Sequence, residues 1–424
     1  MRFIRLKMLR PTLALTTICI VLFELFAALF FWFDERRLPY FEPAEGKGYI
    51  SADGLQVAEA VFHPYVGYVL RANREGSYIS GTRWKANNRG FHNLISDKSD
   101  ACCDYPYVPD KDEIVMGIFG GSVGSGFALS AQMSQIFDKL GRLPKWHGKK
   151  VRVLNFALPG FKQPQQLMTL AYFLNMGQQF DIIINIDGFN EAVTTFKNLD
   201  TGIEPIYPAD SLWGAWGRHL DQADAVESRW SQLSNYHSLT AKLQKQKAKQ
   251  ARLSTLRLYH EAFAGWHVWR ASQSSEKAPK TLKRTGYFPT ALKAPLPHGM
   301  NIWEYTVSVW SQASEAMALL AHQQGAVYVH LLQPNQWDAA TGSYDPIDPD
   351  HPYEWVINPV NETYQLFRSA GLNLKQSGVN FVDITVLFND QQSREIYIDD
   401  CCHYTQLGNE LIFEFTISHL SGLN

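Results

Sequence analysis

The sequence predicts an α/β domain, in which a parallel sheet carries helices on both faces, behind one N-terminal membrane-spanning helix. Two patterns lead to this prediction. Short apolar strands alternate with amphipathic helices from Ile114 onward, and an unbroken apolar segment occupies residues 12–33. Alternation of this kind is typical of parallel sheets, because each parallel strand needs a crossover to reach the next. With 424 residues, of which 46% are apolar, the chain can bury a large core.

The elements of the sheet domain follow from the two hydrophobic periodicities, two for strands and 3.6 for helices. In chain order the expected strands cover residues 114–119, 151–157, 181–186, 326–332 and 380–385, and the expected helices cover 130–140, 165–176, 303–324, 362–376 and 407–419. Ahead of them, the turn-bounded aromatic segments 63–73 and 85–93 are predicted to form short strands that pack on this domain.

Residues 12–33 contain one charge, Glu24, and form enough helix to cross about 30 Å of hydrocarbon. Basic residues precede this segment, whereas the charges after it cancel, so the positive-inside rule keeps residues 1–11 in the cytoplasm. We therefore expect a single-pass protein of the inner membrane whose remaining chain is periplasmic. A cleavable signal peptide is the alternative, but the segment is long and no small-residue cleavage site follows it before Asp34. Glu24 either marks a membrane partner or lies near enough to solvent to be tolerated.

Composition divides the exported part into a linker and one domain. Residues 34–60 are rich in proline and glycine and show no sustained periodicity, as in a linker. Residues 61–424 form the expected domain, interrupted at about 205–285 by a segment without strand signals that is predicted to be a helical insertion. The net charge of −2 and the pI of about 6.7 exclude a general attraction for nucleic acid.

Four cysteines outside the apolar segment occur as two adjacent pairs, Cys102–Cys103 and Cys401–Cys402. Exported thiols are usually bridged. Neighbouring Cα atoms lie about 3.8 Å apart, below the usual disulfide range, so we expect at least one bridge between the two pairs. A metal site made by all four thiolates is the alternative, but adjacent cysteines lack the C-x2-C spacing that such sites use.

The segment GIFGGSVGSG, residues 117–126, follows the first strand of the sheet and excludes two phosphate-binding motifs. A P-loop would need a lysine after Gly126, where Phe127 stands, and a dinucleotide loop would need glycine at position 129. What remains is a strand, a glycine turn, Ser122 and a helix, which is the arrangement of a nucleophilic serine beside an oxyanion site. The motif also fits the G-x-S-x-G elbow of α/β-hydrolases, in which several strands precede the serine.

Near the C-terminus, the segment YIDDCCHYTQLGNELI places Asp400 three residues before His403, directly ahead of the last helix. Together with the serine loop, this Asp-x-x-His resembles the SGNH (GDSL-like) hydrolase superfamily, whose members carry a serine, a glycine, an asparagine and this motif in separate blocks. The middle blocks are matched by NFALPGFKQPQQ, with Gly160, and by NIDGFNEA, with Asn190. Two positions depart from the family pattern: Gly121 stands where aspartate is usual, and Glu191 stands where aspartate is commoner.

The resemblance implies a flavodoxin-like three-layer αβα fold and assigns the site residues. It makes Ser122 the nucleophile, His403 the base and Asp400 the residue that orients it, with Asp399 as the rival carboxylate. The oxyanion hole would consist of the backbone N–H groups of Ser122 and Gly160 and the Asn190 amide. No cofactor and no metal are expected. The aromatic segments before the serine and the runs GFKQPQQ and GFNE resemble a branch of membrane-anchored bacterial members without an assigned substrate.

Three functions are compatible with these residues. The first is an exported, membrane-anchored serine esterase that removes acyl groups, such as acetyl, from an envelope or extracellular carbohydrate or from a small ester. The second is a carbohydrate O-acyltransferase that uses the same triad and depends on a multi-span membrane acyltransferase as partner. The third is a glycan-binding protein on this fold without turnover.

Overall fold

The computed structural model describes most of the predicted domain and two helices of the predicted insertion. It describes residues 19, 21–29, 60–95, 102–201, 203–209, 229–251, 253–277, 296–297, 299–341, 354–391 and 393–423. The expected cytoplasmic segment 1–11, almost all of the linker 34–60 and most of the apolar segment 12–33 lie outside these residues. Among the described helices, none combines the length and the hydropathy that crossing a membrane requires.

A five-stranded parallel sheet forms the centre of the main unit, which confirms the predicted sheet. In chain order its strands are β6 (Glu113–Gly120), β7 (Lys150–Asn155), β8 (Ile182–Asp187), β9 (Val327–Leu332) and β10 (Phe381–Asp383). They lie side by side in the order β10-β9-β8-β6-β7, with every neighbouring pair parallel. Numbered along the chain, this order is 2-1-3-4-5 from the β7 edge, the flavodoxin-like order in which the chain changes direction between β6 and β8.

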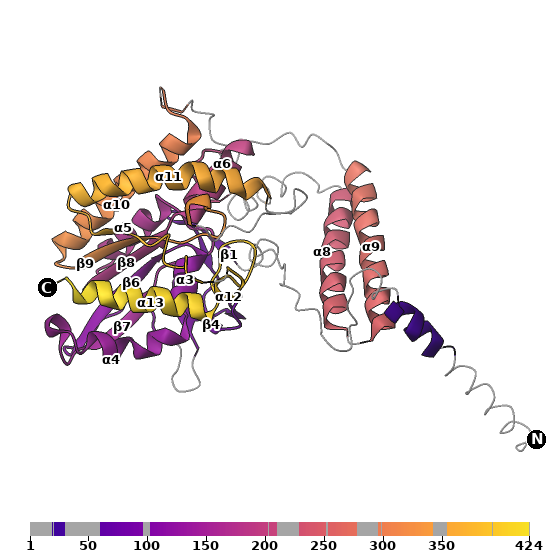
Figure 1. Cartoon of the computed structure of the whole chain (residues 1–424), viewed down its shortest axis with the longest axis horizontal. Coiled ribbons are helices and arrows are strands. Elements are labelled where there is room, and N and C mark those ends of the chain that lie inside the picture. Colours follow the sequence, from indigo (N-terminus) through magenta and orange to yellow (C-terminus); the bar gives the residue numbers. More distant parts are fainter. Residues whose placement is uncertain are drawn as a thin grey trace, which may run out of the picture. The chain divides into compact units, whose positions relative to one another are not determined.

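Two groups of helices cover the two faces of the sheet, so that the domain has three layers (Figure 1). One group contains α5 (Gln165–Asn175), α6 (Phe189–Asp200), α10 (Ile302–Gln323) and α11 (Glu354–Gln376), which contact one another. The other contains α3 (Ser122–Ala128), α4 (Ile136–Leu140) and α13 (Gln406–Ser421). Strands β6 and β8 are buried along their whole length between these layers, which explains why most of their residues are apolar.

The structure differs from the expected single helix at 130–140. A 3-10 turn, η1 (Ala131–Gln135), leads into the short α4, and Ser130 ahead of it has an extended backbone with ψ of 150°. The helix that follows the first strand is instead α3, which begins at Ser122 itself. The apolar residues of this region are therefore spaced for burial against the sheet, although they do not form one continuous helix.

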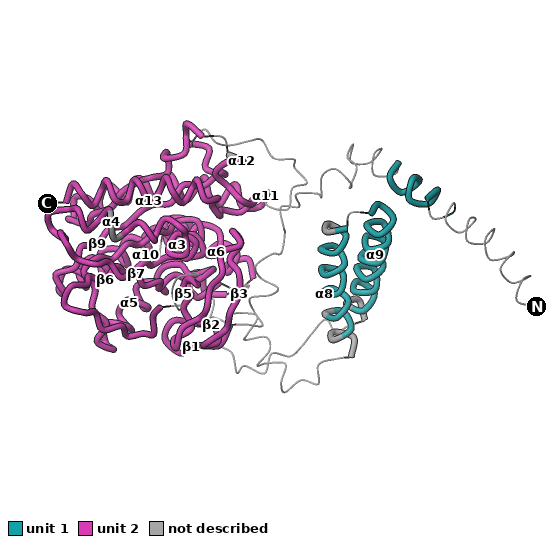
Figure 2. Tube along the Cα trace, turned by 90° about the horizontal axis from the view of Figure 1, so that it is seen from below, with its two compact units in different colours: residues 1–52, 220–287 teal, residues 53–219, 288–424 magenta. Residues whose placement is uncertain are grey.

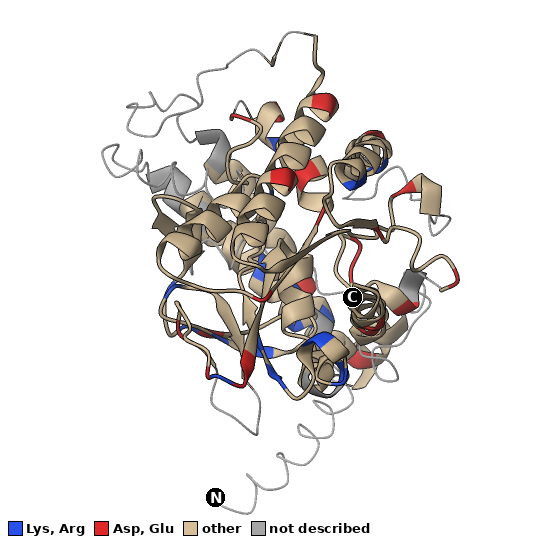
Figure 3. Ribbon diagram, turned by 90° about the vertical axis from the view of Figure 1, so that its left-hand side faces the viewer, with Lys and Arg blue, Asp and Glu red and all other residues tan. Residues whose placement is uncertain are grey.

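Two small antiparallel sheets precede the central sheet, as the aromatic segments predicted. Strands β1 (Ala60–His63) and β2 (Gly67–Leu70) form a hairpin, and β3 (Glu75–Ser77), β4 (Arg83–Ala86) and β5 (His92–Leu94) form a three-stranded sheet. The remaining short helices are η2 (Pro144–Trp146), η4 (Ala339–Thr341) and α12 (Ser393–Ile396). Acidic and basic residues are dispersed along the ribbon (Figure 3), in keeping with the small net charge.

The chain divides into two compact units (Figure 2). The larger unit comprises residues 53–219 and 288–424 and contains every strand of the described residues, whereas residues 1–52 and 220–287 form the smaller one. In the smaller unit α8 (Arg229–Gln250) and α9 (Ser254–Lys277) pack along each other.

Glu24, the one charge of the apolar segment, contacts the first turn of α9. Its carboxylate accepts hydrogen bonds from the backbone N–H groups of Ser254 and Thr255, the second at 2.9 Å, and from the Thr255 hydroxyl. The first N–H groups of a helix have no partner within the helix, so a carboxylate in this place caps it.

Candidate active site

Ser122 lies at the carboxyl end of β6, where two glycines allow the chain to turn closely past its neighbours. Gly120 has a φ of 142°, and a Cβ there would lie 2.2 Å from the Ile186 carbonyl oxygen of the adjacent strand. A Cβ on Gly121 would lie 2.0 Å from Asn190 Nδ2. At position 120 the near atom is backbone, so a side chain there would displace the adjacent strand. An aspartate at position 121, as in the family pattern, would require the Asn190 amide to move from the space that it occupies here.

The loops after β6, β7 and β8 meet at this point. Asn190, in the first turn of α6, donates from Nδ2 to the backbone oxygen of Phe161 at 2.8 Å. Phe161 follows Gly160, whose positive φ of 76° turns the chain at the end of β7. The carboxyl ends of parallel strands beside a change of chain direction are the usual position of ligand sites in open α/β sheets. Ser122, Gly160 and Asn190 thus share one end of the sheet, as expected.

The imidazole of His403 is hydrogen-bonded to Asp399. This corrects the prediction that Asp400 is the residue that orients the ring. His403 Nδ1 lies 2.6 Å from Asp399 Oδ2. The other oxygen, Asp399 Oδ1, accepts from the backbone N–H groups of Cys401, Cys402 and His403 at 3.1 to 3.2 Å.

These bonds explain the choice of carboxylate. An aspartate commonly accepts from backbone N–H groups just after it and so closes a turn over its own side chain. Here the turn is also held from outside, because Ile398 N donates to the His403 oxygen at 2.9 Å and Trp337 Nε1 donates to the Asp400 backbone oxygen at 3.0 Å. The spacing in the sequence favoured the aspartate three residues before His403. The closed turn instead directs the carboxylate of Asp399, four residues before His403, toward the ring.

The electrostatics of this pair favour an ionised aspartate. Burial opposes the charge, but the hydrogen bond from His403, the charge of that ring and the backbone N–H groups outweigh it and hold the pKa of Asp399 below its usual value. An ionised carboxylate keeps the proton of the neutral ring on Nδ1 and leaves the lone pair on Nε2.

Two side chains, Tyr78 and Cys402, connect the Asp399–His403 turn to the serine. The Tyr78 hydroxyl donates to the backbone oxygen of Ser122, and its ring meets the His403 ring edge-on at 6.3 Å between centroids. The Ser122 hydroxyl lies near enough to the Cys402 thiol to influence its pKa. Burial raises the pKa values of both the Tyr78 phenol and the Cys402 thiol, so both stay protonated. Neither residue was expected at the site, because no local pattern links β3 or a cysteine pair to the serine loop.

The cysteines are not bridged between the pairs, which corrects the expected long-range disulfide. Cys102 and Cys103 are bonded to each other, whereas Cys401 and Cys402 are free, with their sulfurs 3.1 Å apart. The two pairs are held by different partners. The Cys103 backbone oxygen accepts from the side chains of Asn87 and Asn93, beside β4 and β5, whereas Cys402 faces the serine.

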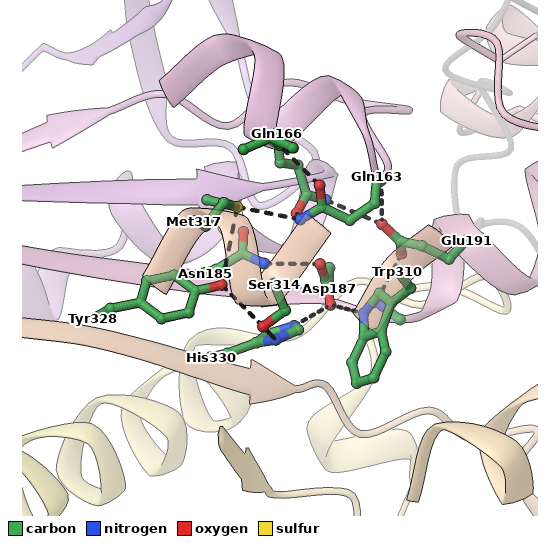
Figure 4. A network of polar contacts seen from close by, with 12 residues as sticks. Gln163, Gln166, Asn185, Asp187, Glu191, Trp310, Ser314, Met317, Tyr328 and His330 are labelled. Carbon is green, nitrogen blue, oxygen red and sulfur yellow. Dashed lines mark hydrogen bonds and ion pairs between the residues drawn. The ribbon is translucent and has the colours of Figure 1, made fainter. Parts of the chain in front are cut away.

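A buried polar network lies behind the asparagine loop (Figure 4). Glu191 Oε1 accepts from the backbone N–H of Gln163 at 2.8 Å and from Gln166 Nε2 at 3.1 Å, and Oε2 accepts from the Gly188 N–H at 2.8 Å. One carboxyl group therefore joins the loop after β7 to the loop after β8. Burial and then the charge of Asp187 raise the pKa of Glu191 to about 8.

The second centre of this network is Asp187 at the end of β8. Its Oδ1 accepts from Trp310 Nε1 at 2.8 Å and lies 2.7 Å from His330 Nε2, and its Oδ2 accepts from Asn185 Nδ2 at 2.8 Å. Ser314 Oγ bonds the other nitrogen of His330 at 2.7 Å. These side chains come from β8, β9 and α10, so the network holds these three elements together next to the loop that carries Asn190.

His92 supports the serine loop from the small sheet. Its Nδ1 lies 2.9 Å from the hydroxyl of Ser125 in α3, and Asn155 Nδ2 donates to the His92 backbone oxygen at 3.2 Å. Its ring lies 4.3 Å from the Trp84 ring between centroids. Burial lowers the pKa of His92 from 6.5 to about 3, since a charged imidazole would lose its hydration here.

We expect His92 to make the protein sensitive to acid. Its folded-state pKa lies below the unfolded value, so it contributes stability above pH 6.5 that is lost as the pH falls toward 3. Between pH 7 and pH 4 this one group should cost about 3 kcal/mol of unfolding free energy. Urea unfolding at both pH values, compared with His92→Gln, isolates the effect because the carboxylates titrate equally in both proteins. An equal acid loss in the variant would contradict this assignment.

No protein-family model and no curated protein matches this chain. Among solved structures, it is similar to a GDSL-like lipase from Bacteroides thetaiotaomicron, with a TM-score of 0.35 and 10% identity over 73% of this chain and 90% of the other. It is also similar to a lipase/acylhydrolase from Enterococcus faecalis (TM-score 0.32, 9% identity, 73% and 96% covered). A third similar structure is an acetylxylan esterase from Geobacillus stearothermophilus (TM-score 0.33, 10% identity, 73% and 96% covered).

Proposed function

We propose that this protein is a serine esterase that removes acyl groups, such as acetyl, from a carbohydrate of the cell envelope or its surroundings. The observation that carries the proposal is the Asp399–His403 pair, whose ring meets Tyr78 edge-on while the Tyr78 hydroxyl donates to the backbone oxygen of Ser122. A carboxylate, an imidazole and a serine hydroxyl gathered from distant parts of a chain are the groups that acyl transfer requires.

Each residue has a separate task in the proposed reaction. Ser122 Oγ attacks the ester carbonyl carbon while His403 Nε2 accepts its proton, and Asp399 orients the ring and stabilises the resulting imidazolium. Collapse of the tetrahedral intermediate breaks the bond to the alcohol, which leaves with the proton from His403. Water, activated by the same imidazole, then releases the acyl group from Ser122.

The oxyanion would be held by the backbone N–H groups of Ser122 and Gly160 and by the Asn190 amide. An amide nitrogen has two hydrogens, and within the described part of the chain one of those on Asn190 bonds the Phe161 oxygen. That bond fixes the side chain, and the second hydrogen remains for the substrate. Each such donor is worth about 3 to 4 kcal/mol of transition-state stabilisation.

We propose further that residues 12–33 anchor the protein in the inner membrane and that its catalytic unit is periplasmic. Support comes from the apolar length of this segment and from the basic residues ahead of it. The bridged Cys102–Cys103 pair agrees with an oxidising compartment.

The test is serine-dependent ester cleavage by the full-length protein in detergent. Wild-type protein should hydrolyse a chromogenic acetyl ester, release acetate from acetylated glycans and be labelled by a fluorophosphonate, whereas Ser122→Ala should lose all three. Ser125→Ala is the matched control, because this second serine of the same loop is engaged with His92 and Asn155 and should leave labelling at Ser122 intact. Labelling that persists in Ser122→Ala, or no turnover by the wild type, would end the proposal. Faster transfer of acetyl to added glycan than to water would instead indicate the acyltransferase.

A further inference from the structure

Three metal-binding groups of consecutive residues converge beside the serine. Cys401 Sγ, Cys402 Sγ and one ring nitrogen of His403 all lie within 4.8 Å of one another, and the two sulfurs are 3.1 Å apart. Cys402 is buried, whereas Cys401 and His403 are half-buried, so the cluster is reached from their side. The sequence disfavoured a metal site because adjacent cysteines lack the C-x2-C spacing, but the closed turn brings these two sulfurs to 3.1 Å from each other.

We propose that Cys401, Cys402 and His403 bind one soft divalent cation, of which zinc and cadmium are the model cases, and that the bound ion blocks the proposed esterase. Two thiolates and an imidazole are the ligands that these ions prefer, and three protein ligands leave a fourth position open. The inhibitory consequence rests on the proposed function, whereas the binding itself does not.

The geometry needs only small changes to accept an ion. Zinc lies about 2.3 Å from thiolate sulfur and about 2.0 Å from imidazole nitrogen, so tetrahedral ligand atoms are about 3.3 to 3.8 Å apart. The sulfurs are slightly closer than this and the third donor is within reach. Ligation through Nε2 would leave Asp399 on the other ring nitrogen, where a carboxylate orients a ligating histidine and raises its basicity.

Binding exchanges protons and moves no electrons. Each thiol loses its proton to solvent, so one dication replaces two protons and forms two metal–sulfur bonds and one metal–nitrogen bond. Because both thiols must lose their protons, binding should weaken as the pH falls. Because Nδ1 is hydrogen-bonded to Asp399, Nε2 is the ring nitrogen whose lone pair can either bind a metal ion or accept the serine proton. It cannot accept the serine proton while it holds a metal ion.

Cadmium titration of the full-length protein tests the site without any need for catalysis. Wild-type protein should bind one equivalent with the ultraviolet absorption of cadmium thiolates and release two protons. Cys401→Ser and Cys402→Ser should each weaken binding by at least about 100-fold, and Asp399→Asn should weaken it about 10- to 100-fold. The other adjacent pair is the matched control: a Cys102→Ser/Cys103→Ser protein, like Cys19→Ser, should bind as the wild type does. Unchanged binding in a Cys401→Ser/Cys402→Ser protein would overturn the proposal.

Turnover measured with and without one equivalent of cadmium separates this inference from the esterase proposal. The wild type should lose its activity and recover it with a chelator, whereas the ratio of inhibited to free activity should approach one in Cys401→Ser/Cys402→Ser. Serine-dependent turnover that persists with cadmium bound at these cysteines would refute the inhibitory role and leave the esterase intact. Cadmium bound at the cysteines of a protein without turnover would refute the esterase and leave the metal site intact.

Discussion

Replacing Asp399 with asparagine should lower kcat of the proposed esterase by about 10⁴-fold, whereas the same change at Asp400 should leave kcat within a few-fold of the wild type. The reason lies in the hydrogen bond between His403 Nδ1 and Asp399 Oδ2. An asparagine amide that donates to Nδ1 would force the ring proton to Nε2, where the serine proton must be accepted. The imidazole would then be present in the wrong tautomer.

The comparison of the two neighbours is informative because both are aspartates of one turn and differ only in their partners. Steady-state kinetics of both variants, with circular dichroism to show that each is folded, provide the measurement. The pKa of Asp399 is held below its usual value, so its carboxylate should stay ionised, and able to orient His403, at neutral pH. A large kcat loss in Asp400→Asn together with a mild one in Asp399→Asn would show that Asp400 orients the histidine.

Replacing Glu191 with alanine should cost about 3 to 5 kcal/mol of unfolding free energy. The change removes the acceptor of the Gln163 and Gly188 backbone N–H groups and of Gln166 Nε2, all of them buried. Each buried donor left without a partner costs about 1 to 3 kcal/mol. The loops after β7 and β8 would also lose the group that joins them, so the Gly160 and Asn190 donors should be less well aligned and kcat should fall as well.

Glu191→Gln is the matched control for this prediction. The raised pKa of Glu191 keeps much of the carboxyl protonated below pH 8, and a glutamine has the same shape and one equivalent oxygen. We therefore expect a loss of about 1 kcal/mol in this variant, with kcat close to that of the wild type. Urea unfolding monitored by tryptophan fluorescence measures both free energies. Equal and small losses in the two variants would mean that the carboxyl group does not hold the loops together.

The parallel sheet and the three strand-end loops could be predicted from the sequence because the information is local. A strand buried on both faces is mostly apolar, and β6 and β8 are so apart from Glu113, Asn185 and Asp187. Successive parallel strands present their carboxyl ends at one edge, so the loops that carry Ser122 and Asn190 had to meet there. Glycine at position 120 is demanded by a backbone with positive φ beside the neighbouring strand.

Only the tertiary structure decided which carboxylate bonds His403 and which cysteines pair. The choice of Asp399 over Asp400 depends on a turn closed by its own backbone hydrogen bonds, which spacing in the sequence does not specify. The bond of Cys102 to its neighbour, in a segment whose Cys103 backbone oxygen accepts from Asn87 and Asn93, was likewise not specified by the spacing of the cysteines. Sequence periodicity reports which face of an element is buried, because that depends on the element's own backbone. Contacts between side chains depend on dihedral angles in turns and on packing between distant segments, and these are settled when the chain folds.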